Sequence, residues 1–522
     1  MAQFSEIAAL RLGFGLSPLA PPPGDLAGVL ASVDAATLPD GWTTRAAAKA
    51  QVALGDLRKA LAAGEIDQDA FRAANQDFNN VRQDTRRRRV ARAVGAPAGF
   101  GERLVQFWSD HFTTVAQNPP HHPLAAAFVD EALRPHLNGR FGDMLAAAET
   151  HPMMLVYLNQ NPSFGPRSPF ARKRPDRKLG LNENLGREVL ELHSLGVGAG
   201  YTQEDVRQLA ELLTGLTYDP REERRYRPQV AEPGAETLLG QRYGGGGIDG
   251  MAEISRAMGD LAVHPATAAH LSRKLAIHFA ADEPPEELVR DLTDTWIGTG
   301  GDLAQVNALL AGTPTWPQLS PQCPAIVRFP GCRAACPGDH RRSRDGHDSE
   351  RGEPGPVASA GPDGQPFGRP RGPDGWAEAA SSWITPQLLS ARIGWALRQP
   401  ARLVDPVPDP RDFLATALGG TVSQALARAV PRAESAREGV AIVLPPPTST
   451  ADEEAPMLTR RTLTKSALLA GCSAAAHPWL NTVTFASAPG DNRLVLIILR
   501  GGMDGRGSRS RSRHPALTMY PA

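Results

Sequence analysis

Residues 180–215 read GLNENLGREVLELHSLGVGAGYTQEDVRQLAELLTG, and this stretch has the pattern of two helices with both ends marked. The first helix is expected to begin at the N-cap Asn182, to carry apolar residues at helical spacing and to stop at Gly196. The second begins at Thr202, and Asp205 three residues later completes the pattern of a capping box. The stretch therefore predicts a helical protein.

The first of these helices separates its polar residues from its apolar ones. Asn184, Arg187, Glu188 and Glu191 share one face, whereas His193 falls near the middle of the apolar side. Paired carboxylates beside a desolvated histidine are groups from which acid–base or metal chemistry can be built. This helix is the first candidate for a functional site.

The same stretch resembles the signature of a bacterial family called domain of unknown function 1800. The matching parts are Asn182-Glu183-Asn184, Arg187-Glu188, Leu190-Glu191-Leu192-His193, Leu195-Gly196 and Tyr201 through Val206. The resemblance covers about residues 5–312 and 364–444. It implies a mainly α fold, which we expect to be an irregular multi-helix bundle, and it names no reaction.

Bulk composition limits the classes of function. The chain has 522 residues, enough for a large core or several domains, and its 56 basic and 56 acidic residues give a net charge of zero. This charge balance does not favour nucleic-acid binding. No apolar run is long enough to span a bilayer. The N-terminus lacks the pattern of a secretory signal. We therefore expect a cytoplasmic protein, with co-export to the periplasm as the alternative.

The sequence divides into four parts. Residues 1–312 are expected to form a helical body, 313–363 an irregular insert, 364–444 the C-terminal helical part of the same domain, and 445–522 a tail. Within the body, residues 217–247 look irregular and end in a glycine run that we interpret as a flexible turn.

The insert has no helical or strand period and is crowded with Pro, Arg, Gly and Ser. A GC-rich gene translated out of frame would give this composition, and this is the explanation we favour. An authentic disordered insert is the second explanation. The third is a metal site formed by Cys323, Cys332, Cys336 and His340, although their spacing lacks the close cysteine pair of a zinc knuckle.

The tail resembles the beginning of another protein, from about residue 457 to residue 505. Residues 459–465 resemble a twin-arginine export signal and 486–488 a cleavage site. Residues 493–499 have the pattern of a buried strand. With Asp504 in the place of a metal ligand, they resemble the start of the sulfatase-like family called domain of unknown function 1501. Only the first strand of that family is present, so its active site is not expected here.

The first functional hypothesis is a metal-dependent or acid–base enzyme of hydrolase type. Glu188 and Glu191 would hold a divalent cation or divide the acid and base roles between them, and Arg187 would neutralise them. A desolvated His193 would transfer protons. The structural alternative is that Glu183, Arg187 and Glu191 form ion pairs on a solvated face, with His193 a satisfied core residue; residue types alone favour this alternative.

Other polar residues could complete such a site. Asn182, Asn184, His111 and His151 are the candidates for substrate binding. For His111, which ends the apolar stretch 102–112, a hydrogen bond to backbone is the structural alternative. A further helix is expected over 264–279, with His270, Lys274 and His278 on one face; its two histidines could share a metal only with ligands from elsewhere.

The second hypothesis is a non-catalytic helical scaffold, or an export and assembly partner of a sulfatase-like protein of the domain of unknown function 1501 family. It is motivated by the tail, because a chain that runs into the start of such a protein implies that the two genes are neighbours. Co-export with a twin-arginine partner would also explain the missing N-terminal signal.

Overall fold

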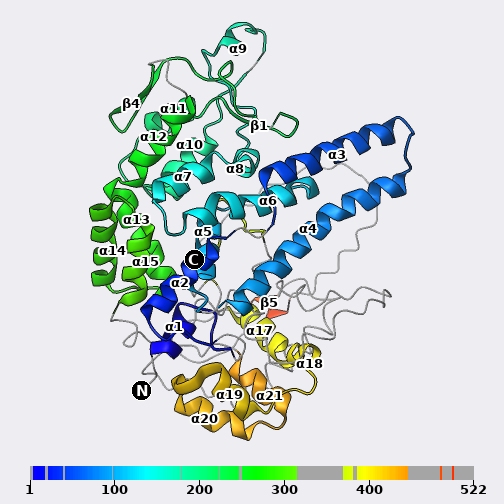
Figure 1. Cartoon of the computed structure of the whole chain (residues 1–522), viewed down its shortest axis with the longest axis vertical. Helices are drawn as coiled ribbons and strands as arrows, with labels where there is room; N and C mark the ends of the chain where they lie inside the picture. The colour runs from blue at the N-terminus through cyan, green and yellow to red at the C-terminus, as the bar shows by residue number, and fades with distance from the viewer. Residues whose placement is uncertain are drawn as a thin grey trace, which may run out of the picture. The chain divides into compact units, whose positions relative to one another are not determined.

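The computed structural model describes residues 4–17, 21–38, 41–96, 98–177, 179–222, 224–245, 250–313, 368–379, 382, 385–444, 483–484 and 497–498. Contacts divide the chain into one unit, Met1–Ala455, and a second, Pro456–Ala522. The described regular structure of the first unit is largely helical (Figure 1), which confirms the mainly α class. The candidate ligands Cys323, Cys332, Cys336 and His340, the segments 459–465 and 486–488, and Asp504 lie outside the described residues.

The first unit begins with α1 (Phe4–Arg11), α2 (Leu26–Ala36), α3 (Thr44–Ala62), α4 (Gln68–Gly95) and α5 (Phe100–His111). It continues through η1 (Pro119–His121), α6 (His122–Phe128), η2 (Val129–Leu133), η3 (Arg134–His136), α7 (Phe141–Glu149), α8 (Pro152–Tyr157) and α9 (Pro169–Arg172). Helices α3 and α4 pack against each other and against α6 (Figure 1).

The stretch 180–215 provides α10 (Asn184–Glu188), η4 (Val189–His193) and α11 (Gln203–Leu212). Four further helices follow the strands described below: α12 (Gly250–Ala262), α13 (Pro265–Phe279), α14 (Glu286–Thr299) and α15 (Leu303–Gly312). After the insert come α17 (Pro386–Arg398), α18 (Pro400–Leu403), α19 (Pro410–Leu418), η7 (Gly419–Thr421), α20 (Gln424–Ala429), η8 (Val430–Arg432) and α21 (Ala436–Val443). In the second unit, β5 (Val483–Thr484) pairs with β6 (Ile497–Ile498), and β6 lies within the strand predicted over 493–499.

The first signature helix differs from the expected single α-helix. It begins at Asn184 with Glu183 in the N-cap position, and from Val189 to His193 it continues as a π-helix. Asn182 still fixes the start, because its side-chain oxygen accepts a hydrogen bond of 3.0 Å from the Asn184 backbone N–H. The helix ends before Gly196, and π-helical turns of this kind are frequent at functional sites.

The second signature helix, α11, agrees with the prediction. Thr202 caps it, and a capping box with Asp205 is formed. Gly186 allows α10 to lie close against α11, since a Cβ atom there would be 3.1 Å from the Val206 carbonyl oxygen. Burial of Val206 and Leu209 fixes the orientation of α11 against the core.

Two clusters of apolar side chains stabilise the first unit. The larger joins α1–α3, α5–α8, α10–α15 and the π-helical segments, and its largest buried side chains include Trp108, Trp296 and Phe107. The smaller joins α17, α19 and α21 around Trp395 and Phe413. The candidate site lies in the larger cluster.

Residues 217–247 are more regular than expected. They contain two antiparallel pairs, β1 (Leu216–Asp219) with β2 (Arg224–Tyr226) and β3 (Ala235–Leu238) with β4 (Gln241–Gly244). Strands of three or four residues are too short to show a clear alternation. The turn between β3 and β4 is Leu239-Gly240, both with positive φ, and this pair lacks the usual Asn-Gly signal of such a hairpin.

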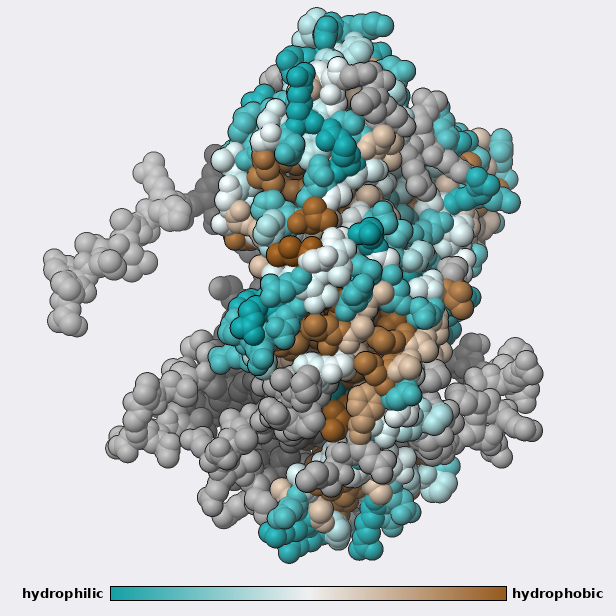
Figure 2. All heavy atoms as spheres, turned by 60° about the vertical axis from the view of Figure 1, so that its left-hand side comes forward, coloured by the Kyte–Doolittle hydropathy of each residue, from teal (hydrophilic) through white to brown (hydrophobic). Residues whose placement is uncertain are grey.

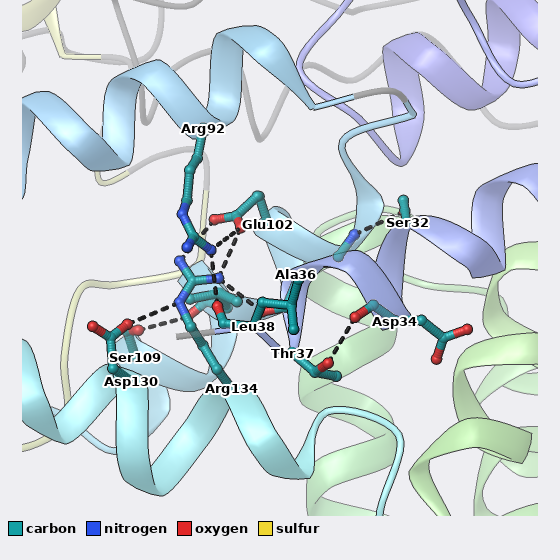
Figure 3. Close-up of polar contacts among 12 residues, drawn as sticks. Ser32, Asp34, Ala36, Thr37, Leu38, Arg92, Glu102, Ser109, Asp130 and Arg134 are labelled. Atoms are coloured by element: carbon teal, nitrogen blue, oxygen red, sulfur yellow. Dashed lines mark hydrogen bonds and ion pairs between the residues drawn. The ribbon is translucent and has the colours of Figure 1, made fainter. Parts of the chain in front are cut away.

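A buried network of charges connects the N-terminal helices (Figure 3). Arg134 donates to both carboxylate oxygens of Glu102, at 2.8 and 3.0 Å, and its Nε atom lies 3.2 Å from Asp130. Arg92 reaches the same Glu102 at 3.3 Å, and Arg134 also donates to the Ala36 carbonyl oxygen. These contacts join segments of α2, α4, α5, η2 and η3.

The surface in Figure 2 is mainly hydrophilic, with hydrophobic residues grouped in patches. Among the residues that the structure describes, the large hydrophobic side chains that are exposed are Phe4, Leu38, Val197, Val263 and Ile297. Among the helices that the structure describes, none is both long and apolar enough to cross a membrane.

Candidate functional site

A buried imidazole–carboxylate pair lies at the centre of the candidate site. His193, the last residue of η4, places its Nδ1 atom 2.7 Å from Oε1 of Glu149, the last residue of α7, and both side chains have zero exposure. Neither His193 Nε2 nor Glu149 Oε2 has a hydrogen-bond partner among the described residues. Unfilled hydrogen-bonding capacity in a buried pair is uncommon in native proteins and indicates a role beyond packing.

His111 lies beside this pair. Its Nε2 atom is 3.3 Å from the His193 carbonyl oxygen, and its Nδ1 atom is 3.1 Å from Nζ of Lys274. An ammonium group can only donate, so Nδ1 accepts and Nε2 carries the proton that goes to the carbonyl. Burial, reinforced by Lys274, holds the pKa of His111 well below its usual value, so this imidazole is neutral.

One face of α13 covers the cluster. Along it, His270 contacts the Leu192 backbone, Lys274 contacts His111, and His278 Nδ1 lies 3.3 Å from Glu378. Burial, with a contribution from Lys274, lowers the pKa of His270 to about 4. The predicted helix with three polar residues on one face is therefore present, and of these His270 contacts the signature helix while Lys274 contacts His111 on α5.

Glu188 marks the partly exposed edge of the cluster. Burial raises its pKa above the usual value, and the nearby charges of Glu191 and Glu149 raise it further, while His193 opposes them. Burial also raises the pKa of the Tyr157 phenol, with a contribution from Glu188. A carboxyl group with a raised pKa beside the buried His193–Glu149 pair is suited to accept and release a proton.

Arg187 and Glu191 lie in a surface network. Arg187 contacts Glu191 at 3.2 Å and Glu183 at 3.5 Å, and it donates to Gln203 at 3.0 Å. These are the ion pairs of the structural alternative.

The two asparagines of the signature differ in their surroundings. Asn182 uses its side-chain amide to bind the backbone carbonyls of Leu158 and Asn159, at 3.1 and 2.7 Å, so it anchors the start of the helix. Asn184 is exposed.

His151 belongs to a separate arrangement. It caps α8, with Nδ1 accepting from the Met153 backbone at 3.0 Å, and its Nε2 atom lies 3.1 Å from Thr44 Oγ1 and 3.6 Å from Glu131. The structure therefore brings together His193, His111 and Glu188, whereas His151 has a different set of neighbours.

The chain matches, over residues 7–448, the family described as "Protein of unknown function (DUF1800)". It belongs to this family. The matched range contains the whole candidate site of this DUF1800 protein and runs across residues 313–363. Comparisons with curated proteins and with solved structures gave no match.

Among the described residues of this DUF1800 protein, no group of three or more His, Cys, Asp or Glu side chains is arranged so that it could hold a metal ion. Around His193, the imidazole of His111 is turned to a carbonyl and to Lys274, and only Glu149 faces the His193 ring nitrogen.

Three members of the cluster in this DUF1800 protein could not be recognised from the sequence. Glu149 and Tyr157 lie on α7 and α8, and Lys274 lies on a helix far along the chain. Glu149 ends an Ala-rich helix, and a charged residue with zero exposure cannot be distinguished there from one at a solvated helix end. Only the fold brings these residues to the signature helix.

Proposed function

We propose that this protein is an acid–base enzyme of hydrolase type, with Glu188 as the group that moves the proton. The observation that supports this best is the fully buried His193–Glu149 pair beneath Glu188. Burying such a pair costs free energy that apolar side chains of similar size would not cost. Functional sites are where such arrangements and shifted pKa values are concentrated.

In the proposed reaction Glu188, in its carboxylate form, takes a proton from a water molecule. The resulting hydroxide adds to the electrophilic atom of the substrate, the bond to the leaving group breaks, and the carboxylic acid returns its proton to the leaving group. His193 and Glu149 act as positioning residues, because both side chains are inaccessible to solvent. Arg187 and Glu191 hold the outer face of the helix through their ion pair.

The test is a screen with chromogenic esters, phosphoesters, peptides and glycosides on the full chain and on Glu188→Gln. General acid–base groups contribute roughly 10²- to 10⁴-fold, so the variant is expected to lose about that factor in kcat at unchanged thermal stability. Glu204→Gln is the matched control, since Glu204 is exposed at the start of α11 and is bonded only to Gln208 among the described residues.

The pH dependence gives a second readout. A general base must be ionised, so wild-type activity should fall as the pH drops through the raised pKa of Glu188. Turnover that Glu188→Gln retains, or no turnover with any substrate class, would remove the proposal. Activity lost on chelation and restored by one divalent metal would replace the acid–base form by a metal-dependent one.

A further inference from the structure

A pocket of about 570 Å³ lies against His151 and shares no lining residue with the His193 cluster. It is lined by Gly41, Trp42, Thr43, Asp130, Glu131, Ala132, Pro135, Ala147, Thr150 and His151. Its volume is in the range of pockets that take small molecules. The proposed hydrolase activity does not use it.

The donors around the pocket converge on one oxygen of Glu131. Oε2 accepts from the Thr44 backbone N–H at 3.1 Å and from the Thr44 hydroxyl at 2.5 Å. Nε2 of His151 lies 3.6 Å from the same oxygen. Because Nδ1 of this histidine accepts from backbone, Nε2 carries the proton and is also a donor. The other oxygen of Glu131, Oε1, has no hydrogen-bond partner among the described residues.

The Glu131 side chain is negatively charged at neutral pH. Burial alone would raise its pKa, but hydrogen bonds from His151 and Thr44 hold the pKa below its usual value. The carboxylate also faces the N-terminus of α3, where a negative charge is favoured. Its side chain is 34% exposed, so a ligand can reach it.

The remaining walls decide which ligand fits. Asp130 is held by Arg134, as Figure 3 shows, and the described residues that line the pocket include no Lys or Arg. Trp42, Pro135 and Ala147 supply apolar surface on the other sides. An anion would be repelled by the Glu131 carboxylate, and a neutral ligand would leave Oε1 without a charged partner.

We propose that this pocket binds an organic cation, a protonated amine on an apolar stem. The ammonium group donates to Oε1 of Glu131, and the stem packs against Trp42 and Ala147. Indole rings also attract cations through their π face. The amine could be a free small molecule or the side chain of a lysine in a peptide, and both present the same chemistry.

Calorimetric titration of the full chain at pH 7 with phenethylamine tests the charge requirement. The neutral control is 2-phenylethanol, which has the same shape. The amine is expected to bind at one site at least tenfold more tightly than the alcohol. Nα-acetyl-lysine amide represents the lysine of a peptide, and its side-chain-acetylated form is the uncharged control. Tighter binding of the lysine amide than of phenethylamine would assign the site to peptides, and tighter binding of phenethylamine would assign it to free amines.

Two variants test the residues. Glu131→Gln is expected to weaken phenethylamine binding at least tenfold. Trp42→Leu, which leaves the Thr44 and His151 contacts to Glu131 in place, is expected to weaken it several-fold. Asp69→Asn is the control, since that carboxylate is 84% exposed and, within the described part of the chain, pairs only with Arg72. Glu188→Gln should also leave amine binding unchanged, so failure of the hydrolase proposal would not affect this result.

Equal binding of amine and alcohol would overturn the proposal, as would an absence of amine binding or an unchanged affinity in Glu131→Gln. Thermal unfolding of each variant identifies a loss of binding that comes from misfolding. If Glu131→Gln is unfolded, the comparison of amine with alcohol on wild type and on Trp42→Leu decides the question alone.

Discussion

Glu236, in β3, is the residue whose surroundings have the clearest consequence for stability. Its side chain is 4% exposed and shares a hydrogen bond with Glu211, while Glu232 adds a further negative charge. Burial and these two carboxylates raise its pKa from the ordinary value of 4.5 to about 7. A carboxyl group with a raised pKa is protonated in the folded protein at a pH where the unfolded chain has lost the proton.

We therefore predict that folding stability decreases as the pH rises from 4.5 to 7 because of this residue, since the folded state binds more protons there than the unfolded state. Replacing Glu236 by Gln should stabilise the protein by roughly 2–3 kcal/mol at pH 8.5 and have almost no effect at pH 4. Urea unfolding at the two pH values measures this. Equal effects of the substitution at both would contradict the assignment.

Individual residues also show which features of the site the sequence predicts and which it does not. His193 was placed on the apolar side of its helix by spacing alone, and it is completely buried. Its partner Glu149 was not predicted, because spacing within one helix carries no information about which side chain of another helix lies opposite. The contact of Lys274 with His111 was not predicted for the same reason. The roles assigned to Glu188, Glu191 and Arg187 stay predictions.

At the scale of the elements, the turn after η4 packs closely against α13 at a glycine. Gly196 has φ +93°, and a Cβ atom there would lie 2.8 Å from Nδ1 of His270. Gly198 has a similar backbone, φ +78°, but nothing lies within 4 Å of its Cβ position. The two glycines differ mainly in the contact with α13.

Gly196→Ala should thus be more destabilising than Gly198→Ala. Both variants carry the cost of positive φ, about 1 kcal/mol, and only the first adds overpacking, typically about 1–3 kcal/mol. Denaturant unfolding gives the difference, and the NMR shift of the His270 ring should change only in Gly196→Ala. Identical losses in the two variants would show that His270 can move away freely.

Element types were predicted better than element details. The capping box of α11 and the helix over 265–279 followed from local sequence, because caps and apolar spacing are local. The π-helical turn of η4 was missed, since an α-helix and a π-helix share nearly the same apolar pattern over five residues. The strands near residues 216–244 were missed because each is short.

At the scale of the whole first unit, Arg134 joins helices that are far apart in sequence. With 3% exposure it contacts Glu102, Asp130 and the Ala36 carbonyl oxygen, and Arg92 shares Glu102. Removing the guanidinium would leave two buried carboxylates without their main partner. Losing one member of such a buried network is more costly than losing a surface ion pair.

Arg134→Met should accordingly destabilise the protein by about 3–5 kcal/mol. The same change at Arg72, whose pair with Asp69 is exposed, should cost less than about 0.5 kcal/mol. Thermal and urea unfolding of both variants provide the comparison. A loss at Arg134 as small as at Arg72 would show that the network contributes no net stability.

The mainly α class was predictable at this scale, whereas the arrangement of the helices was not, because long-range contacts such as that of Arg134 leave no local pattern. The out-of-frame origin of residues 313–363 and the fusion to a sulfatase-like start remain proposals. Sequencing the coding DNA tests the first. Copurification of this protein with a sulfatase-like protein from periplasm would support the scaffold or partner hypothesis, and a failure to copurify would contradict it.

The π-helical segment makes the length of the signature helix as important as its composition. A π-helix accommodates one residue more than the corresponding α-helical turn. Deleting a single residue between positions 189 and 192 would let the backbone become a regular α-helix. Because the α-helix turns more per residue than the π-helix, His193 would keep nearly the same direction relative to Glu188 and Glu149. Conservative exchanges such as Leu192→Met and a one-residue deletion should therefore both leave the buried pair formed, whereas deleting two residues should rotate His193 by about 100° and separate it from Glu149.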